Sequence, residues 1–245
     1  MGLYVYAVGS ASVGELPALQ GVLDQPAYRL DAGSVCAIVS ECSLATVRAE
    51  RRHIAASQRV LTALYTQNDL LPMAFGTVAE SEDELRAFLD DHRDVLEGQL
   101  HRIAGAVEMS LRLGLEVADP IAYLVERTPA LRAARERTFN GRRTPSYDDR
   151  IRLGQMLDEA MRNYREARTA QVLAVVGACC AEVITLPVRG EKEIANLAVL
   201  VDRSGLDQFE AAIHASAAQI DDDIAFKLGG PWPPYNFVQF DPRGG

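Results

Sequence analysis

The chain has 245 residues, of which 48% are hydrophobic and 24% are charged, proportions typical of a globular protein rather than a disordered one. Its formal net charge of −9 disfavours a nucleic-acid partner and an anionic membrane surface, because both bind clustered lysine and arginine. No stretch approaches the roughly 18–20 apolar residues that span a bilayer. The first residues lack the basic region of a signal peptide, so we expect a cytoplasmic protein.

The first part of the chain, residues 1–104, is predicted to be an N-terminal α/β domain with a small mixed sheet. Apolar runs and turn residues predict its strands at 3–8, 28–30, 35–40 and 70–78. Helical periodicity predicts helices over 47–67 and from Ser81 to Gly105. Ser81 followed by Glu84 predicts a capping box at the start of the second helix.

The remaining part, residues 105–245, is predicted to be a second α+β domain. Apolar and polar residues alternate strictly from 107 to 116, as in a half-exposed strand. After this strand, the sequence predicts a helix over 148–177 and two strands at 182–188 and 194–201. It then predicts a helix after Ser204 and a last strand at 223–228. This β-α-β-β-α-β order is that of a modified ferredoxin-like domain, with an enlarged crossover at 117–148 and a tail rich in proline and aromatic residues at 229–245.

The enlarged crossover combines several prolines with a concentration of arginine. On an acidic protein such a basic excursion could dock an acidic partner, and the alternative is a solvated loop. Asp119 and Pro120 could cap a short helix within it. The arginines that could form this docking loop are Arg127, Arg132, Arg135, Arg137, Arg142 and Arg143.

Catalytic and metal-binding patterns are sparse. The sequence has no glycine-rich phosphate loop and no Gly-x-Ser-x-Gly motif, and its four cysteines follow neither a zinc nor a disulfide spacing. The run Asp221–Asp222–Asp223 could bind a hard cation, but a solvated junction between a helix and a strand is the favoured interpretation. We therefore expect no enzyme activity, no cofactor and no metal.

Two short segments stand out from the rest of the chain. Residues 229–238 read Gly-Gly-Pro-Trp-Pro-Pro-Tyr-Asn-Phe-Val, in which three prolines predict a stiff, extended path that carries the only tryptophan. Such a segment loses little entropy on binding a partner; alternatively, it docks internally and fixes the C-terminus across the two domains. Residues 71–78 read Leu-Pro-Met-Ala-Phe-Gly-Thr-Val, where Gly76 permits a bend.

Both segments resemble signatures of the gas vesicle protein F/L family. Members of this family carry Leu-Pro-x-Arg-Phe-Gly-Thr-Val in the first half and Thr-Gly-Pro-Trp-Pro-Pro-Tyr-Ser-Phe-Val near the C-terminus. Eight of the ten residues in 229–238 agree with the second signature, and Gly229 and Asn236 are the two departures. In the first signature the family arginine is replaced by Ala74, so any salt bridge or partner contact of that arginine is absent or relocated here.

The resemblance implies a gas vesicle accessory protein that is not an enzyme and that is found at the gas vesicle. It would bind the small hydrophobic major shell protein, and other accessory proteins, while the vesicle is assembled. Covering an apolar subunit surface transiently would prevent aggregation before polymerisation. The resemblance ties this function first to Pro231, Trp232, Pro233, Pro234, Tyr235 and Phe237, and then to Leu71, Pro72, Phe75, Gly76 and Thr77.

Two other functions remain open at this point. Ferredoxin-like domains host many activities, so a small-molecule-binding or catalytic protein is the alternative from a different class. A permanent structural component of the finished shell is the other possibility. A tight apolar cavity with convergent ionisable groups would favour the former.

Overall fold

The computed structural model describes residues 1–65, 67–139, 144–220 and 223–238, and its contacts divide the chain into two compact units. The first unit holds residues 1–108 together with residues 230–238, and the second unit holds Met109–Gly229. The division falls close to the expected boundary near Gly105. It differs from the expectation by assigning the C-terminal segment to the first unit.

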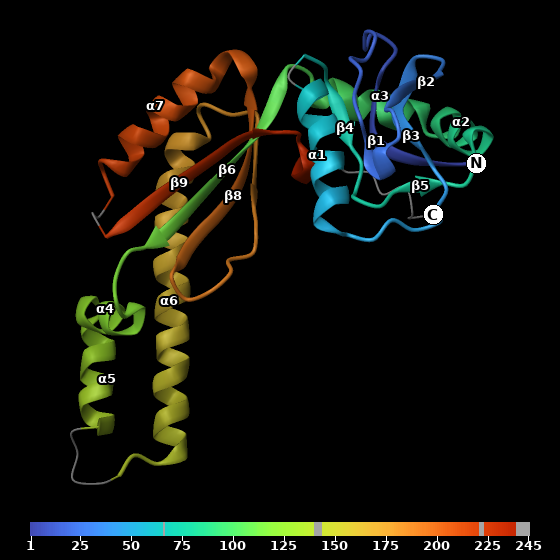
Figure 1. Cartoon of the computed structure of the whole chain (residues 1–245). Coiled ribbons are helices and arrows are strands. Elements are labelled where there is room, and N and C mark those ends of the chain that lie inside the picture. The colour runs from blue at the N-terminus through green and yellow to red at the C-terminus, as the bar shows by residue number, and fades with distance from the viewer. Residues whose placement is uncertain (66, 140–143, 221–222, 239–245) are drawn as a thin grey trace. The chain divides into compact units, whose positions relative to one another are not determined.

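The first unit is built on a five-stranded sheet with the order β2-β3-β1-β4, in which β5 also pairs with β1 (Figure 1). Its strand pairings within the described residues are antiparallel, so the mixed sheet expected from the sequence is wrong. Side chains are buried on both faces of β1, where residues 3–9 are all buried. The strands are β1 (Gly2–Ser10), β2 (Tyr28–Ala32), β3 (Val35–Cys42), β4 (Leu70–Pro72) and β5 (Val78–Ala79).

Helices cover both faces of this sheet, which explains why β1 is apolar throughout. Tyr4 of β1 donates a hydrogen bond to Ser57 of α1 (Arg51–Tyr65), and this places α1 on one face. Val5 and Val8 line a cavity together with residues of α2 (Glu82–Asp91), which lies on the opposite face and is followed by α3 (Arg93–Arg102). A short 3-10 turn, Val22–Asp24, packs beside β3 and α1.

The second unit is a four-stranded sheet with the order β7-β8-β6-β9. Its core forms where α6 and α7 cover one face, with Val172, Val176, Phe209 and Ile213 packed against apolar side chains of β6, β8 and β9. The strands are β6 (Ala106–Leu115), β7 (Glu182–Thr185), β8 (Glu193–Asp202) and β9 (Ile224–Trp232), and the two helices are α6 (Tyr147–Val176) and α7 (Leu206–Ala217). β6 and β9 begin and end in different units, so the chain crosses between the units along both strands.

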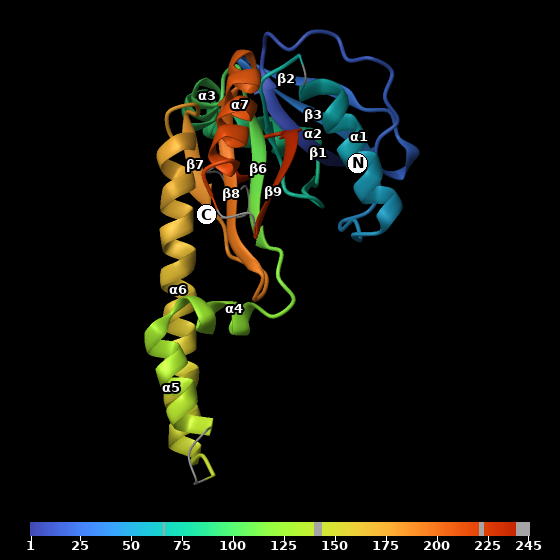
Figure 2. The same ribbon diagram turned by 90° about the vertical axis from the view of Figure 1, so that its left-hand side faces the viewer.

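The expected crossover loop contains two helices, α4 (Pro120–Arg127) and α5 (Pro129–Phe139). They lie alongside the half of α6 that extends past the sheet (Figures 1 and 2). Asp119 caps α4 by accepting hydrogen bonds from the backbone N–H groups of Ile121 and Ala122, as its position before Pro120 predicts. A small core of Leu124, Val125 and Leu131 packs against α6.

Three further expectations need correction. The strand expected at 70–78 is interrupted, because the backbone turns at Gly76 (φ +86°) and Thr77 bonds back to the carbonyl of Ala74. The helix expected from Ser81 to Gly105 breaks at His92 into α2 and α3. The last strand does not stop at 228 but continues to Trp232, so the start of the proline-rich tail is β-strand rather than a free extended path.

Candidate functional site

Hydrogen bonds from the rest of the first unit hold the C-terminal segment, residues 230–238, at three positions. Tyr65 at the end of α1 donates its hydroxyl to the carbonyl of Pro231. Arg102 at the end of α3 donates to the carbonyl of Phe237, whose side chain is fully buried. Hydrogen bonds from two different helices therefore hold both ends of the Pro231–Phe237 stretch, and one aromatic ring anchors it in the core.

A buried carboxylate holds the middle of this segment. Glu108 of β6 is 6% exposed and accepts the backbone N–H of Asn236 at 2.8 Å and its side-chain amide at 2.6 Å. Burial raises the pKa of the Glu108 carboxyl, and the two hydrogen bonds from Asn236 partly offset that rise. Asn236 takes the place of the family serine, and here its longer side chain supplies the second hydrogen bond.

Two aromatic side chains of the segment remain at the surface. Trp232 is 51% exposed and Tyr235 is 44% exposed, whereas Pro233 and Pro234 between them are buried. The two exposed aromatic side chains therefore belong to a backbone segment that hydrogen bonds from Tyr65, Arg102 and Glu108 hold in place. Because their ordering cost is met in the folded protein, these rings lose little further entropy when they contact a partner.

The 71–78 segment lies in the same unit; its first three residues are buried, Ala74 is exposed and residues 75–78 are half-buried. Leu71 and Pro72 are buried and pair with Val8 and Ala7 of β1. After them the chain turns through exposed Ala74, so the position of the family arginine is at the surface. The turn closes when Thr77 donates its backbone N–H and its hydroxyl to the carbonyl of Ala74.

Tyr4 brings the two segments into one neighbourhood. Its hydroxyl accepts the backbone N–H of Gly76 at 3.3 Å, and its ring meets Phe75 edge-on with the centroids 6.1 Å apart. Burial, the largest cause, together with the electrostatic effects of Tyr4 and Glu108 raises the pKa of Tyr235 to about 12. Tyr235 is thus partly desolvated, although 44% of its surface remains exposed.

A cavity of about 330 Å³ opens beside the 71–78 segment. Its walls are mostly apolar, and Glu84, which already accepts a hydrogen bond from the backbone of Glu80, is the one ionisable group that lines it within the described ranges. The cavity is suited to an apolar side chain rather than to acid–base chemistry. Its main wall residues are Val5, Val8, Met73, Val78, Leu85 and Phe88.

The arginines expected to form a basic docking loop are spread over two helices. Arg127 pairs with Asp223 at 3.1 Å and lies over the ring of Tyr123, and Arg132 donates to the carbonyl of Glu126. Arg135 and Arg137 are exposed on α5 and contact no described residue through an ion pair or hydrogen bond. Arg142 and Arg143 lie outside the described residues.

Neither a metal-ligand cluster nor a membrane-spanning helix is present in the part of the chain that the structure describes. No three His, Cys, Asp or Glu side chains are grouped there as metal ligands, and no helix there is long and apolar enough to cross a bilayer. Of the Asp221–Asp223 run, the first two residues fall outside those ranges and Asp223 pairs with Arg127.

Sequence patterns do not predict the residues that hold the C-terminal segment. Tyr65, Arg102 and Glu108 contact a segment that lies more than 100 residues further along the chain, and no local pattern encodes such pairings. The alternation in 107–116 assigns Glu108 to the polar face of its strand. The local signal that points toward these contacts is the stiff aromatic segment itself, which needs a place to dock.

Comparison with known proteins places this chain in a family. A family model described as "Gas vesicle synthesis protein GvpL/GvpF" matches residues 2–239. Gas vesicle protein F of Streptomyces sp. (strain CB03234) is 27% identical over 244 residues, covering 98% of this chain and 100% of that protein. Gas vesicle protein L of the same organism is also 27% identical, over 253 residues, covering 96% of this chain and 92% of that protein.

A solved structure shares the fold. The crystal structure of the gas vesicle protein GvpF from Anabaena sp. PCC7120 superposes with a TM-score of 0.87 at 21% identity, covering 98% of this chain and 99% of that chain. At this identity the likeness shows the common fold alone. It extends over both sheets.

Proposed function

This chain belongs to the GvpL/GvpF family of gas vesicle synthesis proteins, and we propose that it acts as an assembly factor that binds the major shell protein. In this role it also contacts other gas vesicle accessory proteins and works at the gas vesicle in the cytoplasm. It covers the apolar surface of shell subunits until they are added to the growing shell. Partner binding, not catalysis, is the task that the candidate site suits.

The observation that carries the proposal is the pair of exposed aromatic rings on a fastened backbone. Trp232 and Tyr235 are both large, both more than two-fifths exposed, and both part of the C-terminal segment that three hydrogen-bonding side chains hold. Tryptophan and tyrosine are among the residue types most enriched in the side chains that dominate binding energy at interfaces.

The neighbouring cavity supports the same function. An apolar cavity of about 330 Å³ can take one or two aliphatic side chains of a shell subunit in the same unit that carries the exposed aromatic rings. Arg135 and Arg137 on α5 offer a second, charged contact for an accessory protein with an acidic surface. The strand order β7-β8-β6-β9 supports assigning the second unit to the ferredoxin-like class, which hosts many functions and does not by itself argue for an enzyme.

The test is capture of the major shell protein after co-expression. Affinity-tagged wild type is compared with the double variant Trp232→Ala/Tyr235→Ala and with Tyr147→Ala as a control, since Tyr147 is a 77% exposed aromatic of the other unit. We expect the wild type and the control to retain the shell protein and the double variant to lose most of it. Equal capture by all three proteins would show that the aromatic pair is not part of the interface. No capture by folded wild type would refute direct binding.

A further inference from the structure

The chain contains only two lysines among its 25 lysine and arginine residues, and both lie at one place. Lys192 and Lys227 line the same shallow depression in the second unit, together with Arg112 and Arg189. The depression, which we call the lysine depression, has a volume of about 580 Å³. The other 23 of these residues are arginine, so this depression is the one place in the fold that carries lysine side chains.

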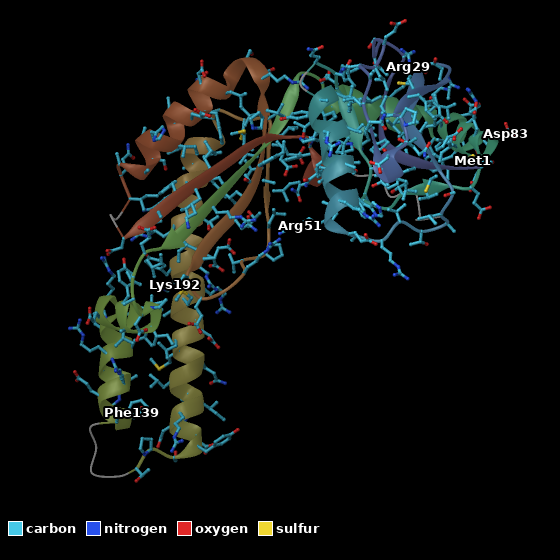
Figure 3. The ribbon with its side chains drawn as sticks, in the orientation of Figure 1. Met1, Arg29, Arg51, Asp83, Phe139 and Lys192 are labelled. Atoms are coloured by element: carbon cyan, nitrogen blue, oxygen red, sulfur yellow. The ribbon has the colours of Figure 1, made fainter. Side chains whose placement is uncertain are left out.

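The fold brings these four cations together from three separate segments. Leu111 and Leu113 of β6 point into the core beneath α6 and α7, so Arg112 between them points to the opposite face of the sheet. Phe226 of β9 also packs on that core, and Lys227 therefore shares the open face with Arg112 on the neighbouring strand. Arg189 and Lys192 come from the loop between β7 and β8. Figure 3 labels Lys192 in this loop.

The loop between β7 and β8 is held in place by α6. The guanidinium of Arg165 donates to the carbonyls of Gly190, Glu191 and Glu193 at 2.8, 3.3 and 3.1 Å. The carboxylate of Glu193 accepts the backbone N–H of Arg189. The loop therefore presents Arg189 and Lys192 from a defined position.

The charges of the depression are unbalanced. Two carboxylates, Glu191 and Glu193, face the same space as the four lining cations. Arg112, Arg189, Lys192 and Lys227 form no ion pair with any residue in the part of the chain that the structure describes. A local excess of positive charge on a chain of net charge −9 attracts the acidic part of a partner and steers it to this spot.

Two glycines in the lining of the depression have open space beside them. A Cβ atom placed on Gly114 or Gly190 would meet no heavy atom within 4 Å. The cations are spread over two strands and a loop with carboxylates between them, an arrangement that suits carboxylates spaced along a chain. Lysine ammonium groups are flexible point charges that can follow such a ligand without the fixed geometry that arginine imposes.

We propose that the lysine depression docks an extended acidic segment of an assembly partner. The choice of a gas vesicle partner rests on the proposed function, whereas the chemistry of the ligand rests on the four cations alone. The bound segment places its carboxylates against Arg112, Lys192 and Lys227 and runs past the two glycines.

The first experiment measures the ligand chemistry without any vesicle protein. A fluorescein-labelled peptide of alternating glutamate and glycine is titrated with the full chain at low ionic strength, and its anisotropy is followed. Lys192→Glu/Lys227→Glu should raise the Kd by at least about tenfold, while Arg152→Glu/Arg162→Glu, which makes the same charge change at exposed positions of α6, should leave it nearly unchanged. Equal weakening by both pairs would show a general charge effect and overturn the proposal. Tripolyphosphate binding at the lysines, without peptide binding, would overturn it too.

The second experiment uses the scarcity of lysine. A carbodiimide joins a carboxylate to an amine, and in this chain only Lys192, Lys227 and the N-terminal amine can supply the amine that couples to a carboxylate of the partner. In the captured complex with the major shell protein, or with another accessory protein, we expect cross-links from partner glutamate or aspartate to Lys192 or Lys227.

The outcomes separate this inference from the proposed function. If the shell protein is captured but no partner cross-links to either lysine and Lys192→Glu/Lys227→Glu captures normally, the docking site is refuted and the assembly function stands. If wild type binds the acidic peptide at the lysines but captures no gas vesicle protein, the docking site stands and the assembly function is refuted.

Discussion

Glu108 and Asn236 are 128 residues apart in the chain and form a two-pronged hydrogen-bonded pair in the first unit. One carboxylate oxygen accepts the backbone N–H of Asn236 and the other accepts its side-chain amide. Since Glu108 lies near the start of β6 and Asn236 follows the end of β9, this pair fastens the C-terminal segment where the chain re-enters the first unit.

Removing the Glu108 carboxylate should destabilise the protein. Glu108→Ala leaves the N–H and the amide of Asn236 without their acceptor in a partly buried place, so we expect a loss of about 1–3 kcal/mol in the free energy of unfolding. Glu108→Gln keeps one acceptor oxygen and the side-chain volume and should cost less. Urea unfolding followed by circular dichroism measures both, and equal losses would mean that the hydrogen bonds contribute nothing.

The same residue makes stability depend on pH. Burial raises the pKa of Glu108 in the folded state above its ordinary value of 4.5, so the neutral carboxyl is favoured by folding. Its contribution is fully present below pH 4.5 and is lost as the pH rises through the folded-state pKa. Urea unfolding across this window should show wild type losing stability relative to Glu108→Gln as the pH rises. Parallel pH profiles for the two proteins would contradict the assignment.

Truncation of Phe237 should destabilise the protein much more than truncation of Trp232, although both are aromatic residues of one segment. Phe237 is fully buried, so Phe237→Ala should cost about 3–5 kcal/mol of unfolding free energy. Trp232 is half exposed, and Trp232→Ala should stay within about 1 kcal/mol of wild type. Thermal unfolding of the two variants side by side decides the point, and a large loss for Trp232→Ala would assign its ring to the core.

Tyr6 carries a second buried polar contact of the first unit. Its hydroxyl accepts the backbone N–H of Val22 at 2.7 Å and bonds to Ser40 at 2.7 Å. Tyr6→Phe leaves two buried polar groups unpaired and should cost about 1–3 kcal/mol. Adding Ser40→Ala removes one of those groups, so the double variant should be less destabilised than the sum of the two single variants. Simple additivity in urea unfolding would show that the two hydroxyls do not interact.

Local patterns predicted most elements of the fold. The alternation of apolar and polar residues over 107–116 corresponds to β6, and the helical spacing of apolar residues over 148–177 corresponds to α6. Both were predictable because a strand or helix with one buried face repeats its apolar residues at a regular interval. Ser81 accepts the N–H of Glu84 as a cap should. The reciprocal bond of the predicted capping box goes instead from the N–H of Glu80, one residue before the cap, to the carboxylate of Glu84.

Features that depend on distant contacts were not predictable in this way. The turn at Gly76 breaks a segment that is apolar enough for a strand, and the bonds that stabilise the turn come from Thr77 and from Tyr4, far away in the sequence. The continuation of β9 to Trp232 overrides the expectation that prolines leave a sheet, because Pro231 lies on an edge strand. The motif residues could be named from the sequence, but which rings face outward could not.

The most direct test of the account is gas vesicle formation in a host whose own copy of this protein is replaced by Trp232→Ala/Tyr235→Ala at wild-type level. Vesicles are counted by electron microscopy and by the loss of light scattering when pressure collapses them. The account predicts few or no vesicles while the variant remains folded and abundant. Normal numbers of vesicles would contradict the assignment of the outward aromatic pair to assembly.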